Sequence, residues 1–287
     1  MQIPERIKQQ EGRSALVDGI PFELPVVCAP SPVIMAGFTI NLKKAAAVLP
    51  GRELFPLQVG NDRGVLVVAV IDYQNTTIGK YIEFSIGIAC THGSEPGPPL
   101  LPAALMNVFG TGQYVLDLPV SSEVSVKGGK GIWGMPKHQA NLDFTVGAHS
   151  ASSIYELEGL SAVRLDIDLP TSPALPVRSA AVNYCAFRGM LMKSTIYMKG
   201  NARISLMDKG SARLTVGTHP RVQVLNDLDI SPDPLMTAFV AEATGTLDDH
   251  IEAWFLDYDK VPSATPEGLE SVVNLSRSEE WLAPPRR

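Results

Sequence analysis

The amino-acid sequence predicts a mostly β fold, an antiparallel β barrel or cone with a few short flanking helices. Two observations carry this prediction. Short segments rich in β-branched and aromatic residues recur along the chain while helical patterns are few, and 24 glycines and 23 prolines divide its 287 residues with turns. A barrel or cone of strands also leaves an interior pocket in which a side chain can be buried.

Composition limits the class of protein. The chain has no obvious linker and no internal repeat, which predicts a single domain over residues 1–287. The formal net charge is −6 with no long basic run, so neither nucleic acid nor an anionic membrane is an expected partner. No uninterrupted apolar run is long enough to span a bilayer, and residues 1–13 are too polar for a signal peptide. Three widely spaced cysteines fit a reducing cytoplasm.

The first elements follow from prolines and capping residues. We expect an irregular arm over residues 1–24 that packs on a neighbouring subunit. Residues 25–36 are expected to form an edge strand or an extended segment, because three prolines interrupt them. Asn41 is a suitable N-cap for a short alanine-rich helix that ends at Leu49, before a Pro-Gly pair.

Two consecutive strands are the clearest β elements. Residues 64–73 contain an unbroken apolar run that predicts a buried strand, and residues 80–90 alternate in character. One face of the second strand carries Tyr81, Glu83, Ser85 and Gly87, and the other carries Ile82, Phe84, Ile86 and Ile88.

The remainder of the chain continues the β pattern. A loop rich in glycine and proline over 92–99 leads to a short helix over 100–109, and a late helix is expected over 248–257. Further strands are expected over residues 113–118, 139–146, 153–158, 162–169, 190–197, 202–207 and 213–216. Residues 262–287 have few hydrophobic anchors and are expected to form a tail.

The densest group of special residues is Gly-Gly-Lys-Gly-Ile-Trp-Gly-Met-Pro-Lys-His over 128–138, which we interpret as a glycine-rich turn leading to Lys137. Pro136 fixes the backbone before this lysine, and Trp133 and Met135 supply apolar surface. An ammonium held in apolar surroundings is costly to keep charged, and a neutral amine attacks a ketone to form a Schiff base. The alternative is a turn between strands that carries an ordinary surface lysine.

The same stretch contains G-x-G-x-x-G, but it is not expected to bind a dinucleotide. Pro136 follows the last glycine within two residues, and the preceding segment is largely polar rather than a buried strand. A phosphate-binding P-loop is excluded because residue 131 is glycine instead of serine or threonine.

Trp133 to Lys137 resembles the aromatic-Gly-aromatic-Pro-Lys segment of the acetoacetate decarboxylase superfamily, in which the lysine forms an imine with the substrate. The order of features from the Asn41 helix to the late helix is also similar to that family. The resemblance implies that Lys137 is the Schiff-base nucleophile and that Glu83 is the active-site glutamate that moves protons.

Other residues are assigned around this pair, each with an alternative role. Tyr81 lies on the same strand face as Glu83 and is expected to bind substrate, unless it is a packed core tyrosine. Trp133 and Met135 are expected to form the pocket wall. His138 is expected to contact substrate, to tune Lys137 or to transfer protons, unless it is a surface residue beside the turn.

The chain departs from the family pattern in several positions. His138 stands where family decarboxylases carry a second lysine, and Gly131 where many members have an acidic residue. Residues 67–69 are apolar where the second glutamate is expected, and no arginine lies near Ser31. These departures leave imine chemistry better supported than decarboxylation of acetoacetate itself.

The sequence therefore predicts a Schiff-base carbon–carbon lyase that decarboxylates a β-keto acid. One alternative is an aldolase-dehydratase that condenses a keto acid with an aldehyde through the same lysine, and another is a non-catalytic ligand-binding barrel. We expect a small keto acid as the partner, assembly into a homo-oligomer, no cofactor, and no metal because the remaining histidines lack ligand spacing.

Overall fold

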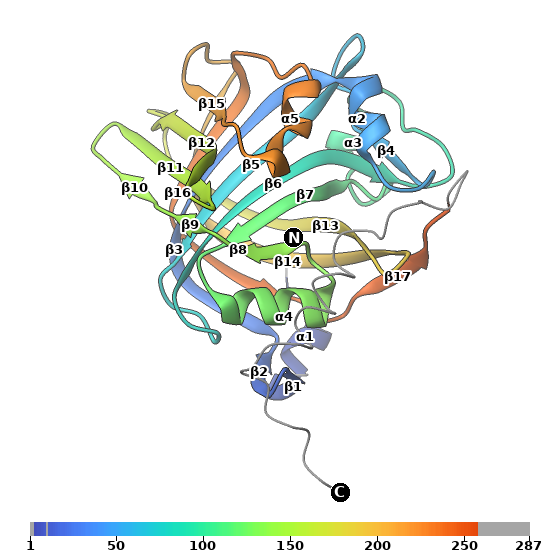
Figure 1. Ribbon diagram of the computed structural model, residues 1–287, viewed down its shortest axis with the longest axis vertical. Helices are drawn as coiled ribbons and strands as arrows, with labels where there is room; N and C mark the ends of the chain where they lie inside the picture. The colour runs from blue at the N-terminus through green and yellow to red at the C-terminus, as the bar shows by residue number, and fades with distance from the viewer. Residues whose placement is uncertain (1–2, 10, 258–287) are drawn as a thin grey trace, which may run out of the picture.

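The computed structural model describes residues 3–9 and 11–257, and its centre is a closed β barrel (Figure 1). In this part of the chain, seven strands follow one another around the barrel in the order β6-β5-β3-β16-β14-β13-β7, and β7 pairs back with β6. They are β3 (Val26–Asn41), β5 (Arg63–Tyr73), β6 (Tyr81–His92), β7 (Gly112–Val120), β13 (Leu175–Phe187), β14 (Met190–Leu206) and β16 (Pro234–Leu247). The predicted mostly β barrel is confirmed, and its neighbouring strands are antiparallel except for a short parallel pairing of β13 with β7.

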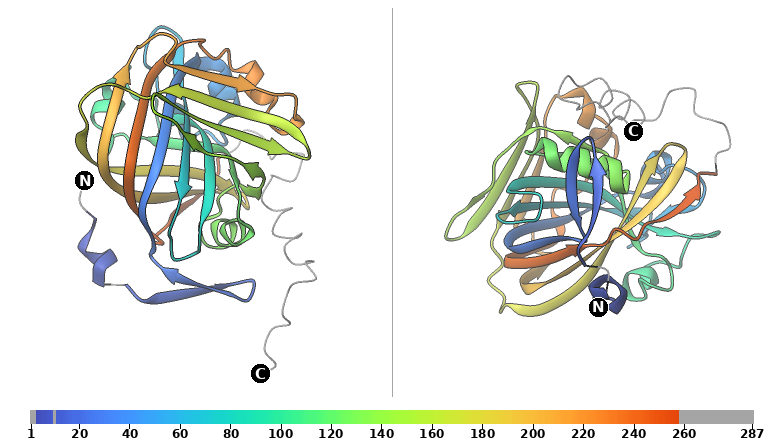
Figure 2. Two further views of the ribbon diagram at one scale, coloured as in Figure 1. Left: turned by 90° about the vertical axis from the view of Figure 1, so that its left-hand side faces the viewer. Right: turned by 90° about the horizontal axis from the view of Figure 1, so that it is seen from below.

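A second, smaller sheet covers one side of the barrel. It consists of β9 (Asn141–Leu142), β10 (Thr145–Val146), β11 (Ser150–Leu157), β12 (Leu160–Asp168) and β15 (Ala212–Val216). Figure 2 shows it lying across the barrel strands. The main hydrophobic core lies between the two layers and joins Phe38, Leu66, Phe84 and Ile86 of the barrel to Tyr155 and Leu165 of the smaller sheet.

The two layers explain the sequence patterns of β5 and β6. On β6 the Phe84 face packs in the core between the sheets, and the Glu83 face lines the barrel interior. On β5 both faces are buried or half-buried, since Val68 and Val70 enter the core while Ile71 faces the interior. The expected strand alternation is therefore correct, and the unbroken apolar run of β5 reflects burial on both sides.

Residues 26–36 are extended, as one of the two alternatives predicted, but the other alternative, an edge strand, is wrong. β3 lies inside the sheet, between β5 and β16. Its prolines are accommodated where the ladder is interrupted, because pairing with β5 begins only at Val33, and the register with β16 shifts between Val240 and Ala243. A bulge of this kind needs no ladder N–H from Pro30 or Pro32.

The described residues of the N-terminal arm form regular elements that pack on the same chain's barrel, in contrast to the irregular arm predicted for residues 1–24. It forms α1 (Glu5–Gln9) and a hairpin of β1 (Arg13–Val17) and β2 (Ile20–Leu24). Asp18 and Gly19 both have positive φ, as a two-residue hairpin turn requires. Arg6 pairs with Asp248 at 2.5 Å, which ties the arm to the segment after β16.

The helices are few and short, as predicted, but the late helix predicted from the sequence is not formed. α2 (Leu42–Val48) begins at the expected N-cap, where Lys44 N donates to Asn41 Oδ1 at 3.1 Å. α3 (Leu101–Ala104) is shorter than expected. The prediction of a helix over 248–257 is wrong, because this segment contains β17 (Glu252–Phe255). β17 pairs with β14 and brings Trp254 against His92.

Other departures concern strands. β14 is one long strand where two were expected, and β13 and β16 were not anticipated. β4 (Leu54–Pro56), the 3-10 helix η1 (Pro220–Val222) and α5 (Val224–Asp227) complete the description apart from α4 and β8, which are described below. The tail expected over 262–287 lies outside the described residues. Of the helices in the described chain, none has both the length and the apolar character needed to cross a membrane.

Candidate active site

The glycine-rich stretch is a helix, so the turn predicted before Lys137 is wrong. α4 (Glu123–Trp133) begins at Ser122, whose side chain caps Ser125 N, and ends at Gly134 in the left-handed conformation with φ +65°. The chain then enters β8 (Lys137–Gln139), which pairs with the end of β7. Figures 1 and 2 show α4 lying across one end of the barrel.

The glycines of α4 allow close approach instead of making a turn. A Cβ added at Gly129 would lie 2.4 Å from Cδ of Lys137, and one at Gly131 would lie 2.5 Å from a methyl group of Val17. A Cβ at Gly128 would meet the ring of Phe22 at 2.4 Å. Each glycine costs the helix about 1 kcal/mol relative to alanine. The contacts that glycine permits, above all with the stem of Lys137, give the reason for this composition.

Lys137 is buried at the junction of β8, β6 and α4. Its side chain is 5% exposed, and Nζ lies 2.6 Å from Oε2 of Glu83. Nζ also donates to Oγ of Ser125 at 3.0 Å, and it lies 5.4 Å from the centroid of the Tyr81 ring. The amine is thus held between a carboxylate and an aromatic face from β6 and a hydroxyl from α4.

Two tyrosines complete this cluster. Tyr73 and Tyr81 come from paired positions on β5 and β6, with ring centroids 4.6 Å apart. Burial raises the pKa of Tyr81 well above its usual value, the charge of Glu83 raises it further, and a hydrogen bond with Ser125 opposes this. Burial and the charge of Glu83 likewise raise the pKa of Tyr73. Both hydroxyls are therefore protonated at neutral pH and able to donate.

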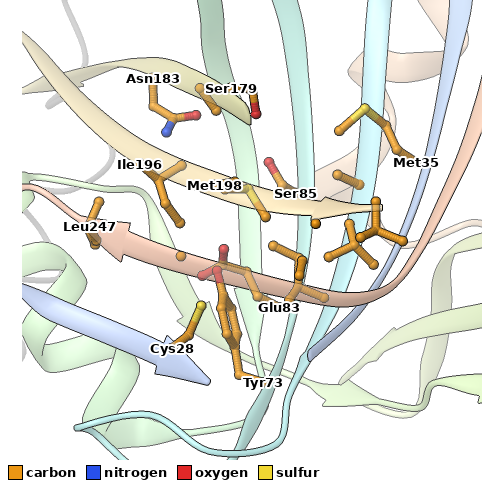
Figure 3. A pocket seen from close by; sticks show the side chains of 18 of the residues that line it. Cys28, Met35, Tyr73, Glu83, Ser85, Ser179, Asn183, Ile196, Met198 and Leu247 are labelled. Atoms are coloured by element: carbon orange, nitrogen blue, oxygen red, sulfur yellow. The ribbon is translucent and has the colours of Figure 1, made fainter. Parts of the chain in front are cut away.

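The cluster opens into a cavity of about 310 Å³ inside the barrel. Figure 3 shows side chains from several strands converging on it, with Tyr73 and Glu83 pointing toward one another. Ser85, Gln113, Ser179 and Asn183 add polar groups on one side, and Gln113 donates to Asn183 at 2.8 Å. Most of the remaining lining is aliphatic. Among the described residues that line the cavity, Glu83 supplies the only carboxylate, and the cations are Lys137 and Lys199.

Four of the six residues singled out in the sequence meet at this cavity. Lys137, Glu83, Tyr81 and Met135 line it. Trp133 does not, because it packs in an adjoining hydrophobic cluster and its Nε1 donates to the carbonyl of Asp248 at 2.8 Å. Trp133 therefore supports the segment that carries Lys137 instead of forming the cavity wall.

His138 also lies outside the cavity lining, on the opposite face of β8 from Lys137. Its Nε2 lies 3.0 Å from Oδ1 of Asp117 and 3.3 Å from the hydroxyl of Tyr155. Arg221 Nε donates to the same oxygen of Asp117 at 2.8 Å. Burial would raise the pKa of Asp117, but the hydrogen bonds and charges of His138 and Arg221 outweigh it and hold this pKa below its usual value. His138 thus belongs to a buried ionic network, and we do not assign it to substrate binding.

Two residues of the cluster were not anticipated. Tyr73 ends the apolar run of β5, and the signal for it is its register opposite Tyr81 in a hairpin that the sequence did predict. Ser125 had no such signal, because it reaches Lys137 only through the unpredicted helix α4. Two departures from the family pattern can be located in the structure. Near the expected arginine, Ser31 is buried and donates to Ala29 O, and at the expected second glutamate Ala69 forms apolar cavity wall.

In the described residues, no group of three or more histidine, cysteine and carboxylate side chains is arranged to hold a metal ion. Cys28 lines the cavity beside this cluster, and burial raises the pKa of its thiol to about 11.

Comparison with known structures identifies relatives of this barrel. One is an acetoacetate decarboxylase from Legionella pneumophila, with 14% identity and a TM-score of 0.55, covering 78% of this chain and 85% of that chain. A second acetoacetate decarboxylase has 15% identity and a TM-score of 0.57, covering 90% and 100%. The enduracididine biosynthesis enzyme MppR has 14% identity and a TM-score of 0.54, covering 82% and 89%. At these identities the likeness shows the fold.

Sequence comparison gives the family. No curated protein matches the chain in sequence. The family model for acetoacetate decarboxylase (ADC) matches residues 7–174, which is more than half of the chain and contains Tyr73, Glu83, Ser125 and Lys137. The chain therefore belongs to the acetoacetate decarboxylase family.

Proposed function

We propose that the protein is a Schiff-base carbon–carbon lyase that decarboxylates a β-keto acid through Lys137. The observation that carries this proposal is the contact of 2.6 Å between Lys137 Nζ and Glu83 inside a largely apolar cavity. A carboxylate at this distance is placed to accept a proton from the ammonium, and the resulting amine is the nucleophile that imine formation needs.

The reaction follows from this arrangement. The neutral amine adds to the ketone carbonyl of the substrate, and the loss of water gives a protonated imine. The bond between the α-carbon and the carboxylate then breaks, carbon dioxide leaves, and the electron pair moves into the imine to form an enamine. Protonation of the α-carbon and hydrolysis release a ketone and free Lys137. Overall, one β-keto acid anion and one proton give one ketone and one carbon dioxide.

The surrounding groups have distinct roles in this proposal. Glu83 exchanges protons with the amine and with the α-carbon. Ser125 holds the amine in position, and the hydroxyls of Tyr73 and Tyr81 orient Glu83 and the substrate oxygen. The apolar walls, including Met135, replace the hydration of the substrate carboxylate and so favour its conversion to neutral carbon dioxide.

The test is chemical trapping. Incubation with β-keto acids and borohydride should add a reduced adduct to the peptide that contains Lys137, and carbon dioxide release should depend on that residue. Lys137→Ala is the blank. Lys193→Ala is the matched control, because Lys193 also pairs with a glutamate at 2.6 Å but lies outside the cavity lining. Glu83→Gln is expected to slow carbon dioxide release by about 10²–10⁴-fold. An adduct on another lysine would contradict the proposal.

A second candidate uses the same imine for aldol condensation and dehydration. It is favoured by a structural neighbour, MppR, described in complex with the condensation product of pyruvate and imidazole 4-carboxaldehyde. The uncharged residues Ser31 and Ala69, at positions where the family pattern has charged groups, also favour it. If no β-keto acid releases carbon dioxide while pyruvate and an aldehyde give an unsaturated keto acid that depends on Lys137 and Glu83, this second reaction replaces the first.

Failure to trap any imine with ketones, keto acids or keto acid–aldehyde pairs would favour a third function, a ligand-binding barrel without catalysis.

A further inference from the structure

The cavity continues well beyond the amine, and its continuation is apolar. Glu83 on β6 pairs across the sheet with Ile71 on β5, which pairs with Val33 on β3, which pairs with Val240 on β16. All of these positions line the cavity. At the level of the carboxylate, three adjoining strands therefore present only aliphatic side chains to the interior.

The next level along the strands repeats this pattern. Ser85 on β6 is followed across the sheet by Ala69, Met35, Ala238 and Ile204. All of them line the cavity, and Figure 3 shows Ser85 and Met35 on its wall. The apolar surface thus extends away from Lys137 along β5, β3, β16 and β14, while the polar groups Gln113 and Asn183 lie on β7 and β13.

Small side chains keep this space open. The interior of a small barrel is usually filled by its own side chains. Here five alanines line the cavity: Ala69, Ala181, Ala202, Ala238 and Ala243. Each is at a position where a leucine or phenylalanine would occupy the interior, so the volume of about 310 Å³ is set by the choice of residue on four strands.

From these observations we propose that the substrate carries an extended apolar chain, so that the β-keto acid is a medium- or long-chain 3-oxo acid and the product a methyl alkyl ketone. This rests on the proposed function for the chemistry at Lys137. A substrate as small as acetoacetate would fill one end of the cavity and leave the aliphatic walls facing water. An alkyl chain along β5, β3 and β16 buries these walls and gains about fourfold in affinity for each methylene group.

The first test measures binding without chemistry. Methyl propyl, methyl pentyl and methyl nonyl ketone are titrated by calorimetry into the wild-type protein and into Lys137→Ala. We expect affinity to rise about fourfold per added methylene in both proteins until the cavity is full. Affinity that is independent of chain length, or that falls with it, would overturn the proposal.

The second test fills the cavity. Ala238→Leu and the milder Ala238→Val and Ala69→Val shorten the apolar region without touching Lys137, and Ala46→Leu on the exposed face of α2 is the control. The cavity variants should lose at least tenfold in affinity for methyl nonyl ketone and a much smaller factor for methyl propyl ketone, whereas Ala46→Leu should change neither. Unchanged binding of the long ketone in all three would contradict the proposal.

The two proposals fail in different ways. If long ketones bind tightly and Ala238→Leu weakens their binding, but no imine is trapped, the apolar site is supported and the Schiff-base function is rejected. If all chain lengths are trapped on Lys137 with equal affinity, the Schiff-base function stands and the extended-chain substrate is rejected.

Discussion

At the scale of single residues, Lys137 and His138 are neighbours in sequence but serve opposite sides of the barrel wall. The lysine reaches Glu83 in the interior, and the histidine reaches Asp117 and Tyr155 outside it. Adjacent residues of a strand point to opposite faces. The ionic network of Asp117 therefore holds β8 through the face that points away from the cavity. This network stabilises the position from which Lys137 acts, although it does not contact the cavity.

Removing the carboxylate of Asp117 should therefore destabilise the fold. Asp117→Asn removes an almost fully buried carboxylate that lies within hydrogen-bond distance of both His138 and Arg221. We expect a loss of about 3 kcal/mol in the free energy of unfolding, measured by urea denaturation at neutral pH. Asp166→Asn is the control, because the pair of Asp166 with Arg164 at 2.6 Å is more exposed and should contribute less than about 1 kcal/mol. Equal losses in the two variants would contradict the role of burial.

The same network predicts a pH dependence. The pKa of Asp117 is lower in the folded protein than in the unfolded chain, so its stabilising contribution is present above the unfolded value of about 4 and is lost as pH falls through the folded value. The stability gap between wild type and Asp117→Asn should narrow as the pH falls below about 4. A gap that widens below about pH 4 would contradict a lowered pKa of Asp117 in the folded protein.

At the scale of elements, sequence patterns predicted what local periodicity determines. The alternation of β6 places Glu83 and Tyr81 inside, and the capping residue Asn41 starts α2. The helix α4 was missed because three glycines within it argue against a helix locally, and the contacts that make glycine useful there come from residues remote in sequence. Ser125 was not predicted as a site residue because it lies on this helix, whereas Lys137 was predicted from its family motif.

The long strands β13 and β16 were missed for a related reason. Their inner faces mix apolar residues with small or polar ones, such as Ser179 and Asn183 on β13 and Ala243 and Gly245 on β16, since they border a cavity instead of a packed core. Such residues give no apolar alternation. Sequence patterns identify strands whose apolar side chains pack in a core, whereas the inner faces of these two strands line a cavity.

The close contact of α4 with Lys137 gives a prediction at this scale. In Gly129→Ala the added methyl group would lie 2.4 Å from the lysine stem, so Lys137 must move away from Glu83 and Ser125. We expect a large loss of borohydride trapping with little loss of folding. Gly131→Ala is matched, because it lies in the same helix with an equally close neighbour, but that neighbour is Val17 of the hairpin. Trapping that falls equally in both variants would show that general disruption of α4, and not displacement of the amine, is responsible.

At the scale of the whole molecule, the smaller sheet buries the outer face of β3, β5 and β6, and α4 with the N-terminal hairpin covers one end of the barrel. The region around α3 remains apolar and exposed. Leu100, Leu101, Leu105, Met106 and Val108 each expose more than a third of their surface, and Val108 reaches 74%. Several exposed aliphatic side chains within nine consecutive residues are typical of an interaction surface.

This segment is where we expect the predicted homo-oligomer to form, since Arg6 and Arg13 of the N-terminal arm already pair with Asp248 and Asp249 of the same chain. Light scattering at micromolar concentration should give a mass above that of one 30.9 kDa chain, and Val108→Asp should shift it toward the monomer because a charge would be buried in the contact. Leu16→Asp is the matched control, since Leu16 is 71% exposed but lies on the N-terminal hairpin, away from α3 (Figure 1). A monomeric wild-type protein would remove the prediction, and dissociation caused by Leu16→Asp alone would move the interface from α3 to the hairpin.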